Sequence, residues 1–175
     1  MKTIDIEERV AKAKRLFKEN GYNCCQAVVL AYNDIFDIDD MTAAALSSGF
    51  GGGMGRMREV CGSVSGMVIL AGMLKPACDP SDKVARTGNY ALVQNVAEQF
   101  RSINGSIICK DLLGVRQGTP ATSDNVHGIP ESPVPSDRTQ EYYKKRPCEE
   151  LVGISARIIG EEIIRSKQEI CEKNL

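Results

Sequence analysis

Residues 49–66 read Gly49-Phe50-Gly51-Gly52-Gly53-Met54-Gly55-Arg56-Met57-Arg58-Glu59-Val60-Cys61-Gly62-Ser63-Val64-Ser65-Gly66, and the apolar run Met67 to Leu74 follows. Cys61 stands where a helix begins. Three more cysteines, Cys24, Cys109 and Cys148, also stand at or near predicted helix starts. A helix N-terminus presents free N–H groups and partial positive charge, which lower the pKa of a nearby thiol. The pattern therefore predicts sulfur chemistry.

Helical periodicity dominates the rest of the chain. Ile6, Val10, Ala13 and Phe17 form one apolar stripe, whereas no β-branched stretch is long enough to indicate a sheet. We predict an all-α, single-domain bundle of about six helices over residues 1–175. The expected helices are Asp5 to about Gly21, Cys24 to about Phe36, Asp40 or Thr42 to Gly49, Gly62–Leu74, Asp79-Pro80-Ser81 to about Asn104, Ile107–Leu113, and Pro147 through Ile170.

Two of these helices carry more specific predictions. Asn23 with Gln26 three residues later forms a capping box at the start of the second helix. The long helix that ends near Asn104 is expected to bury Val84, Leu92, Val96, Phe100 and Ile103. Residues 115–140, in contrast, are too long and too proline-rich for a simple connector. We interpret them as a lid, an arm or a partner-binding loop.

Charge and hydropathy exclude several classes of partner. The formal net charge is −1, from 22 basic and 23 acidic residues, so no field attracts nucleic acid or an anionic membrane. The apolar run 67–74 is shorter than the roughly 20 residues of a membrane span. Residues 1–18 form a charged amphipathic pattern rather than a signal peptide. A cytoplasmic protein is expected, in which the seven cysteines stay reduced.

The spacing of the four helix-start cysteines excludes compact sulfur motifs. Cys24, Cys61, Cys109 and Cys148 are separated by 37, 48 and 39 residues. No CxxC pair exists, which argues against a zinc ribbon, a thioredoxin-like dithiol and the compact ferredoxin spacing. Each cysteine alone suits a small buried hydrophobe. All four at helix starts favour one shared site.

The other three cysteines and the histidine are weaker candidates for site residues. Cys25 points about 100° away from Cys24 on a helix, so both are not expected to face one centre. Cys78 is expected in a loop and Cys171 in a fraying last turn. His127, the only histidine, lies in the arm, where a solvated residue is a simpler interpretation than a Cys–His pair.

The glycine cluster has two interpretations. Gly51, Gly52 and Gly53 would let backbone N–H groups close on an anion or on the sulfurs of a metal cluster. Alternatively, the chain passes tightly between helices here. The Gly-Lys-Ser/Thr ending of a nucleotide-binding loop is absent. Gly62, Gly66 and Gly72 fall near one helical face and would let a second helix approach closely, within the chain or at a dimer seam.

Together these residues resemble the family of redox-active proteins named for the cysteine pattern C_GCAxxG_C_C. The resemblance covers about residues 5 to 165, with Ser63 in place of the usual alanine and Cys25 in place of Ala or Ser. The matching segments are Asn23-Cys24-Cys25-Gln26, the glycine-rich stretch 49–55, Cys61-Gly62-Ser63-Val64-Ser65-Gly66, Cys109 to Gly114, and Cys148.

The resemblance implies a small helical bacterial or archaeal protein with four functional cysteines. The chain is similar also to the iron–sulfur domain of split-Soret cytochrome c, although it has no Cys-x-x-Cys-His haem attachment. By that analogy Cys24, Cys61, Cys109 and Cys148 would ligate an iron–sulfur cluster, of the [2Fe–2S] type. Gly51, Gly52, Gly53 and Gly62 would then donate N–H groups around it.

Three functions remain open, of which we favour the first. The first is an iron–sulfur electron carrier with a redox partner protein. Alternatively, it is a cluster-free thiol–disulfide protein in which Cys61 attacks and another of the four cysteines, such as Cys24, resolves. The third interpretation is a non-catalytic assembly module. A homodimer is expected because the helix Gly62–Leu74 is apolar on nearly every side.

Overall fold

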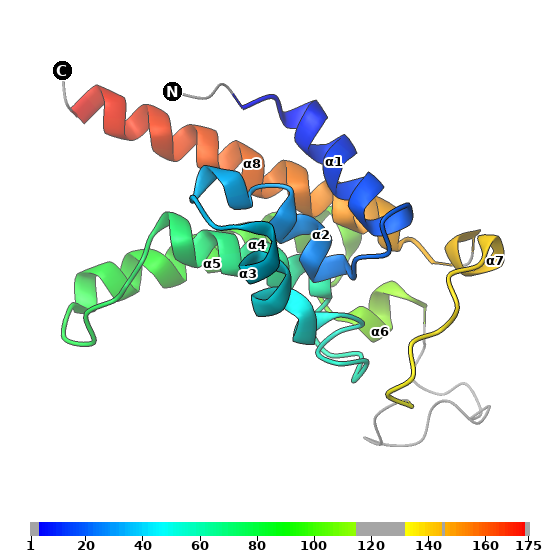
Figure 1. The fold of residues 1–175 in the computed structure, drawn as a ribbon. Helices are drawn as coiled ribbons and strands as arrows, with labels where there is room; N and C mark the ends of the chain where they lie inside the picture. The colour runs from blue at the N-terminus through cyan, green and yellow to red at the C-terminus, as the bar shows by residue number, and fades with distance from the viewer. Residues whose placement is uncertain (1–3, 115–131, 145, 174–175) are drawn as a thin grey trace.

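The computed structural model describes residues 4–114, 132–144 and 146–173, and within them it is all α, as predicted. The described residues contain an isolated antiparallel bridge, Val60 with Ile108, and no strand. Figure 1 shows the helices in chain order. They are α1 (Ile6–Lys18), α2 (Cys24–Leu30), α3 (Asp40–Ser47), α4 (Gly62–Leu74), α5 (Lys83–Asn104), α6 (Cys109–Leu112), α7 (Gln140–Lys144) and α8 (Cys148–Lys173).

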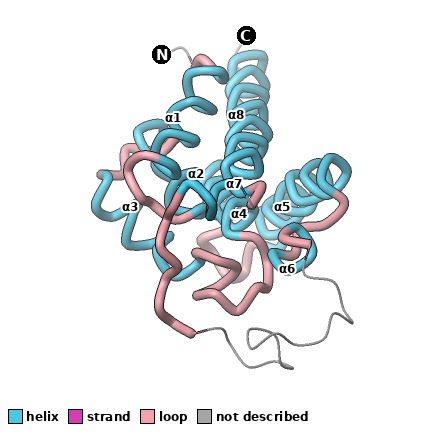
Figure 2. The backbone as a smooth tube through the Cα atoms, turned by 90° about the vertical axis from the view of Figure 1, so that its right-hand side faces the viewer, coloured by secondary structure: helices cyan, strands magenta, loops and turns pink. Residues whose placement is uncertain are grey.

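The first and last long helices pack side by side. Helix α1 starts after the cap Asp5, whose carboxylate accepts from the N–H of Glu8. It runs antiparallel to α8 (Figures 1 and 2). Ion pairs between Lys14 and Glu150, and between Arg157 and Glu7, tie the two helices together. The start of α8 therefore lies near the end of α1.

Helix α4 is the centre of the fold. It is packed by α2, α5 and α8, and its residues 62–67 are all buried. A Cβ on Gly66 would lie 2.9 Å from the Val28 side chain, so this glycine lets α2 approach closely. Gly72 has no such neighbour, and the predicted close approach is wrong there. Because the chain's own helices cover α4, its apolar surface no longer argues for a dimer, and the homodimer stays a prediction.

Helix α2 ends earlier than predicted, at Leu30 instead of Phe36. Tyr32 has the non-helical dihedrals φ −132° and ψ 0°, and a single turn of 3₁₀ helix, Asn33–Ile35, follows. The buried Asn33 side chain donates to the Ile38 carbonyl and to the Asp40 carboxylate, at 2.8 and 2.7 Å. These bonds hold the chain in a turn and divert it from α2 into α3.

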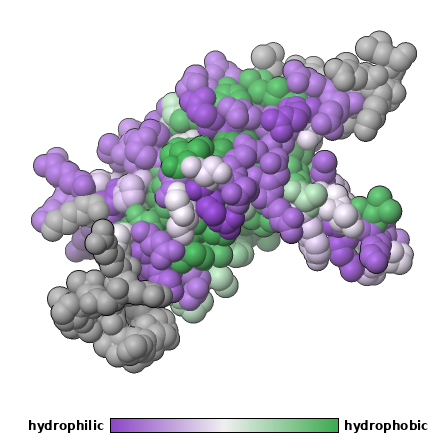
Figure 3. All heavy atoms as spheres, turned by 180° about the vertical axis from the view of Figure 1, so that it is seen from behind, coloured by the Kyte–Doolittle hydropathy of each residue, from purple (hydrophilic) through white to green (hydrophobic). Residues whose placement is uncertain are grey.

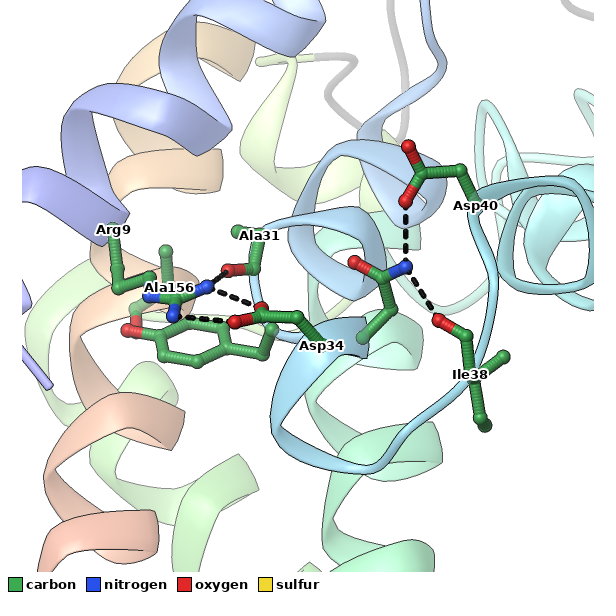
Figure 4. A network of polar contacts seen from close by, with 8 residues as sticks. Arg9, Ala31, Asp34, Ile38, Asp40 and Ala156 are labelled. Carbon is green, nitrogen blue, oxygen red and sulfur yellow. Dashed lines mark hydrogen bonds and ion pairs between the residues drawn. The ribbon is translucent and has the colours of Figure 1, made fainter. Parts of the chain in front are cut away.

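The turn after α2 is part of a polar network (Figure 4). Arg9 from α1 binds both carboxylate oxygens of Asp34, at 2.5 and 2.8 Å, and also donates to the Ala31 carbonyl. The hydroxyl of Tyr32, a fully buried residue, donates to the Ala156 carbonyl on α8 at 2.8 Å. The network therefore joins α1, the turn after α2, and α8.

Helix α5 buries less than predicted. Leu92, Val96 and Phe100 lie in the core as expected. Val84 and Ile103, however, are 83% and 62% exposed. The start of α5 projects away from the other helices (Figure 1), so only its middle reaches the core.

Two further boundaries differ from the sequence-based prediction. Helix α6 spans Cys109–Leu112 rather than Ile107–Leu113, because residues 107 and 108 pair with the chain before α4. Helix α7, Gln140–Lys144, was not predicted. Most of the proline-rich arm, residues 115–131 with His127, lies outside the described residues.

The surface seen from behind is largely hydrophilic around a central hydrophobic area (Figure 3). In the described parts of the chain, no helix is both long and apolar enough to cross a bilayer.

Candidate four-cysteine site

Each of the four cysteines stands at the start of a helix, as predicted. Cys24, Cys109 and Cys148 are the first residues of α2, α6 and α8, and Cys61 occupies the cap position of α4. The chain before α4 and helix α6 lie together at one end of the molecule, away from the start of α1 and the end of α8 (Figure 2). The helix starts are therefore gathered at this end.

The capping box at Asn23 sets the position of Cys24. The Asn23 side chain accepts from the N–H groups of Cys25 and Gln26, and the Gln26 side chain accepts from the Asn23 N–H at 3.0 Å. The Asn23 amide also donates to the Ser48 carbonyl at 2.9 Å. The start of α2 is thus fastened to the chain that enters the glycine cluster.

A short antiparallel pairing places Cys61 beside Cys109. The Cys61 N–H donates to the Ile107 carbonyl at 2.8 Å, and the Cys109 N–H donates to the Glu59 carbonyl at 2.7 Å. These bonds flank the Val60–Ile108 bridge. Two cysteines that are 48 residues apart in sequence are therefore held by the backbone itself.

All four cysteines line one cavity of about 60 Å³. Cys61 and Cys109 are buried, with 6% and 7% of their surface exposed, and Cys24 and Cys148 are partly buried. A single water needs roughly 10–15 Å³ of such space. The cavity is therefore large enough for a ligand of several atoms, and the four cysteines share it.

The glycines of residues 51–62 give the cysteines room. A Cβ on Gly62 would collide with the Cys24 sulfur and would lie 2.7 Å from the Phe50 carbonyl. A Cβ on Gly53, where φ is +73°, would lie 2.8 Å from the Cys109 Cβ. Gly51 packs in the same way against Asn23. These contacts support the interpretation of the cluster as a tight crossing of the chain, and the binding of an anion or a metal cluster by its N–H groups stays a prediction.

Gly52 makes the direct backbone contact with a thiol. Its N–H acts to lower the pKa of Cys24 and so favours the thiolate. Two larger effects act in the opposite direction. Burial, and after it the neighbouring Cys61, raise the pKa of Cys24 to about 12.

The pKa values of Cys109 and Cys148 also move upward, against the prediction of helix-lowered values. Burial, followed by the charges of Cys61 and Cys109, raises the pKa of Cys148 to about 11. Burial and the charge of Cys61 raise the pKa of Cys109, while Arg58 and Arg146 act to lower it. Desolvation in a shared pocket therefore exceeds the effect of a helix start. Cys61 acts on all three of the other thiols, which places its charge among them.

Sequence analysis missed the basic side chains of the cavity. Arg58, Arg138 and Arg146 all line it, and so does Tyr142. Arg58 stands three residues before Cys61 and Arg146 two residues before Cys148, so proximity in sequence was the available signal. Arg138 had no such signal, because the fold brings it from the segment before α7.

Cys25 and Cys78 are not among the residues that line the cavity. Cys25 is fully buried in the core, which agrees with the prediction that it faces away from Cys24. Cys78 is exposed in the loop between α4 and α5, as predicted. Cys171 lies in the last turn of α8.

A site for one metal ion needs several ligand side chains grouped around one point. Within the part of the chain that the structure describes, no three side chains of Cys, His, Asp or Glu are grouped as a single ion requires. The four cysteines thus share a pocket without surrounding a single point.

The chain was also compared with known proteins. A family model described as "Putative redox-active protein (C_GCAxxG_C_C)" matches residues 22–162, a range that contains all four cavity cysteines. No curated protein and no solved structure matches the chain.

Proposed function

The chain belongs to the C_GCAxxG_C_C family of redox-active proteins, and on that premise we propose that Cys24, Cys61, Cys109 and Cys148 together bind an iron–sulfur cluster. The observation that carries this proposal is their convergence on one cavity from four separate helix starts. Four cysteine thiolates are the usual ligand set of [2Fe–2S] and [4Fe–4S] clusters.

The shape of the pocket favours a cluster over a single zinc ion. A structural zinc site holds four ligands around one point, each at about 2.3 Å from the metal. No such group is present among the described residues. A [2Fe–2S] cluster divides its four thiolates between two irons, so its ligands need not surround one point. The volume of about 60 Å³ also suits a ligand of several atoms.

The protein residues would hold and tune such a cluster. Bound in this pocket, a [2Fe–2S] cluster would supply one-electron transfer to and from a redox partner protein. The Gly52 N–H, which favours the thiolate of Cys24, would withdraw electron density from that ligand. Gly62 and Gly53 let the backbone pass close to Cys24 and Cys109.

Thiol–disulfide exchange is the second candidate, and the closeness of Cys24 and Cys61 supports it. The Cys24 sulfur lies against Gly62, and the Cys61 charge is the largest electrostatic influence on Cys24. In this reaction the two thiols would form one S–S bond, and the disulfide of a partner protein would take up two electrons and two protons. The raised pKa of Cys24 makes it a poor attacking group, so Cys61 would attack.

The test compares six single variants after anaerobic reconstitution with iron and sulfide. We expect Cys24→Ser, Cys61→Ser, Cys109→Ser and Cys148→Ser each to lose most of the bound iron and the visible absorption. Cys78→Ser, in an exposed loop, and Cys25→Ala, beside a proposed ligand but in the core, are the matched controls and should retain both.

Two results would contradict the proposal. If the wild-type protein binds neither iron nor sulfide, the four cysteines are not cluster ligands. Iron content that is equal in the four ligand variants and in the controls would show adventitious binding. A reversible Cys24–Cys61 disulfide in iron-free protein, trapped by alkylation and mass spectrometry, would favour the thiol–disulfide mechanism.

A further inference from the structure

Three arginines share the cavity with the four cysteines, and no function has been assigned to them. Arg58 comes from the chain before α4, and Arg138 and Arg146 flank α7. All three are partly buried. Guanidinium groups remain charged at any ordinary pH, so the pocket contains a lasting positive charge.

Specific contacts fix the three side chains. An Nη of Arg58 lies 4.0 Å from the Cys109 sulfur, within donor distance of a thiolate. Arg138 donates to the Phe17 carbonyl at 2.6 Å, and its guanidinium lies 4.8 Å from the centre of the Phe17 ring. Arg146 lies 4.8 Å from the centre of the Tyr142 ring. Aromatic stacking holds the last two without neutralising them.

The segment that carries Arg138 is attached to the rest of the protein. Arg56 donates to the Ser132 carbonyl at 2.8 Å, and the Tyr143 hydroxyl donates to the Lys18 carbonyl at 3.2 Å. Arg138 is therefore positioned from the glycine-rich chain on one side and from the end of α1 on the other.

For Arg138 and Arg146 the described chain offers no carboxylate as counter-charge. Among the described residues that line the cavity there is no Asp or Glu, and none of the ion pairs of these residues joins a carboxylate to Arg138 or Arg146. Charged groups that are taken partly out of water need an opposite charge nearby. The groups in the pocket that become negative are the four cysteines, when they are deprotonated as ligands.

We propose that Arg138 and Arg146 are counter-charges of the four-cysteine centre and raise its reduction potential. This inference rests on the proposed function. Four thiolates give the centre a negative charge, and reduction by one electron makes that charge larger without forming or breaking a bond. Nearby positive charges stabilise the reduced form more than the oxidised form, because the Coulomb attraction grows with the charge. Removing one of them should therefore lower the potential.

The experiment measures the midpoint potential of the full-length, reconstituted protein at an electrode, which supplies the electron. We expect Arg138→Gln and Arg146→Gln each to lower the potential, whereas Arg138→Lys, which keeps the charge, stays close to the wild type. Arg157→Gln is the control, because Arg157 pairs with Glu7 on the outside of α8 and does not line the cavity. Its potential should be unchanged.

The outcomes separate this inference from the function on which it rests. If the wild type and both Gln variants load iron and have the same potential, the arginines are not counter-charges, although the cluster proposal stands. If Arg138→Gln fails to load iron while Arg138→Lys loads it, the positive charge is needed for assembly, which supports the inference. A wild type that binds no iron would overturn both proposals.

Discussion

The two ends of helix α2 both contain buried polar groups, but they differ in the partners of those groups. After its last turn, the Tyr32 hydroxyl bonds to the Ala156 carbonyl, and Arg9 pairs with Asp34 (Figure 4). At its start, Cys24 faces three other cysteines across a cavity. The first end is a set of complementary donors and acceptors, whereas the second is a set of like ligands.

The difference teaches how to separate structural from functional polar groups. Complementary pairs hold helices together and need nothing more. Burial in the shared pocket and the neighbouring thiols raise the pKa values of Cys24, Cys109 and Cys148, which opposes their ionised forms. Such an arrangement contributes little to folding by itself and suits the binding of a cation or a cluster. Substitutions at the two ends should therefore change different measurable properties.

The largest expected effect is a loss of stability when the polar network after the last turn of α2 is disrupted. Tyr32→Ala removes a fully buried ring and its bond to Ala156, and should lower the free energy of unfolding by about 3–5 kcal/mol. Urea denaturation measures this change. The milder Tyr32→Phe, which removes only the hydroxyl, should cost about 1 kcal/mol.

The same two Tyr32 variants test the separation of the two ends. Iron and sulfide bound per folded molecule should equal the wild-type values, because neither variant alters the cavity. If Tyr32→Phe lost the cluster while it stayed folded, the two ends would be coupled and the comparison would be wrong.

The next test compares alanine substitutions of two glycines, of which Gly62 lies beside the cysteine at the start of α2. Gly62→Ala would place a Cβ against the Cys24 sulfur and 2.7 Å from the Phe50 carbonyl. Although alanine usually stabilises a helix, we expect a loss of about 1–3 kcal/mol from overpacking. We also expect weaker binding of iron, because the Cys24 sulfur must move.

Gly88→Ala is the matched control for Gly62→Ala. Gly88 lies within α5 with nothing within 4 Å of an added Cβ, so alanine should stabilise the protein by about 0.5–1 kcal/mol. Thermal unfolding and iron analysis follow both variants. Equal effects of the two substitutions would show that the chain before α4 does not press against Cys24.

The smallest expected effect depends on pH. Hydrogen bonding and charge from Arg9 hold the pKa of Asp34 below its ordinary value. Because the folded-state pKa is lowered, the pair stabilises the protein above the unfolded pKa of about 3.9 and loses this contribution as the pH falls. Asp34 is about a third exposed, so Asp34→Asn should cost only about 0.5–1 kcal/mol at pH 7.

Urea unfolding of wild type and Asp34→Asn at several pH values measures this contribution. The two proteins should converge in stability as the pH falls through the lowered pKa of Asp34 and the carboxylate becomes protonated. A difference that persists unchanged at low pH would mean that the carboxylate charge is not the stabilising feature.

Local signals in the sequence predict the features that depend on neighbouring residues. Asn23 and Gln26 form the predicted capping box, and α4 spans the predicted Gly62–Leu74. A cap is a contact within one turn, so the sequence contains the whole interaction. The placement of all four cysteines at helix starts follows from the same local rules.

Features that depend on tertiary contacts could not be predicted in this way. The early end of α2 is set by the bonds of Asn33 to Ile38 and Asp40, and the pairing of Cys61 with Cys109 depends on a two-residue bridge. Neither the end of α2 nor this pairing follows from a periodic pattern of apolar residues in the sequence. Arg138 enters the cavity from a segment whose helix, α7, is only five residues long. The upward pKa shifts likewise follow from burial, which spacing does not reveal.

The most direct test of the central claim is chemical analysis of wild-type protein that has been purified and reconstituted without oxygen. Iron, acid-labile sulfide and protein are measured on one sample. We expect two irons and two sulfides per chain, as a [2Fe–2S] cluster requires, together with a visible absorption that dithionite bleaches. Colourless protein with no iron and no sulfide would contradict the account.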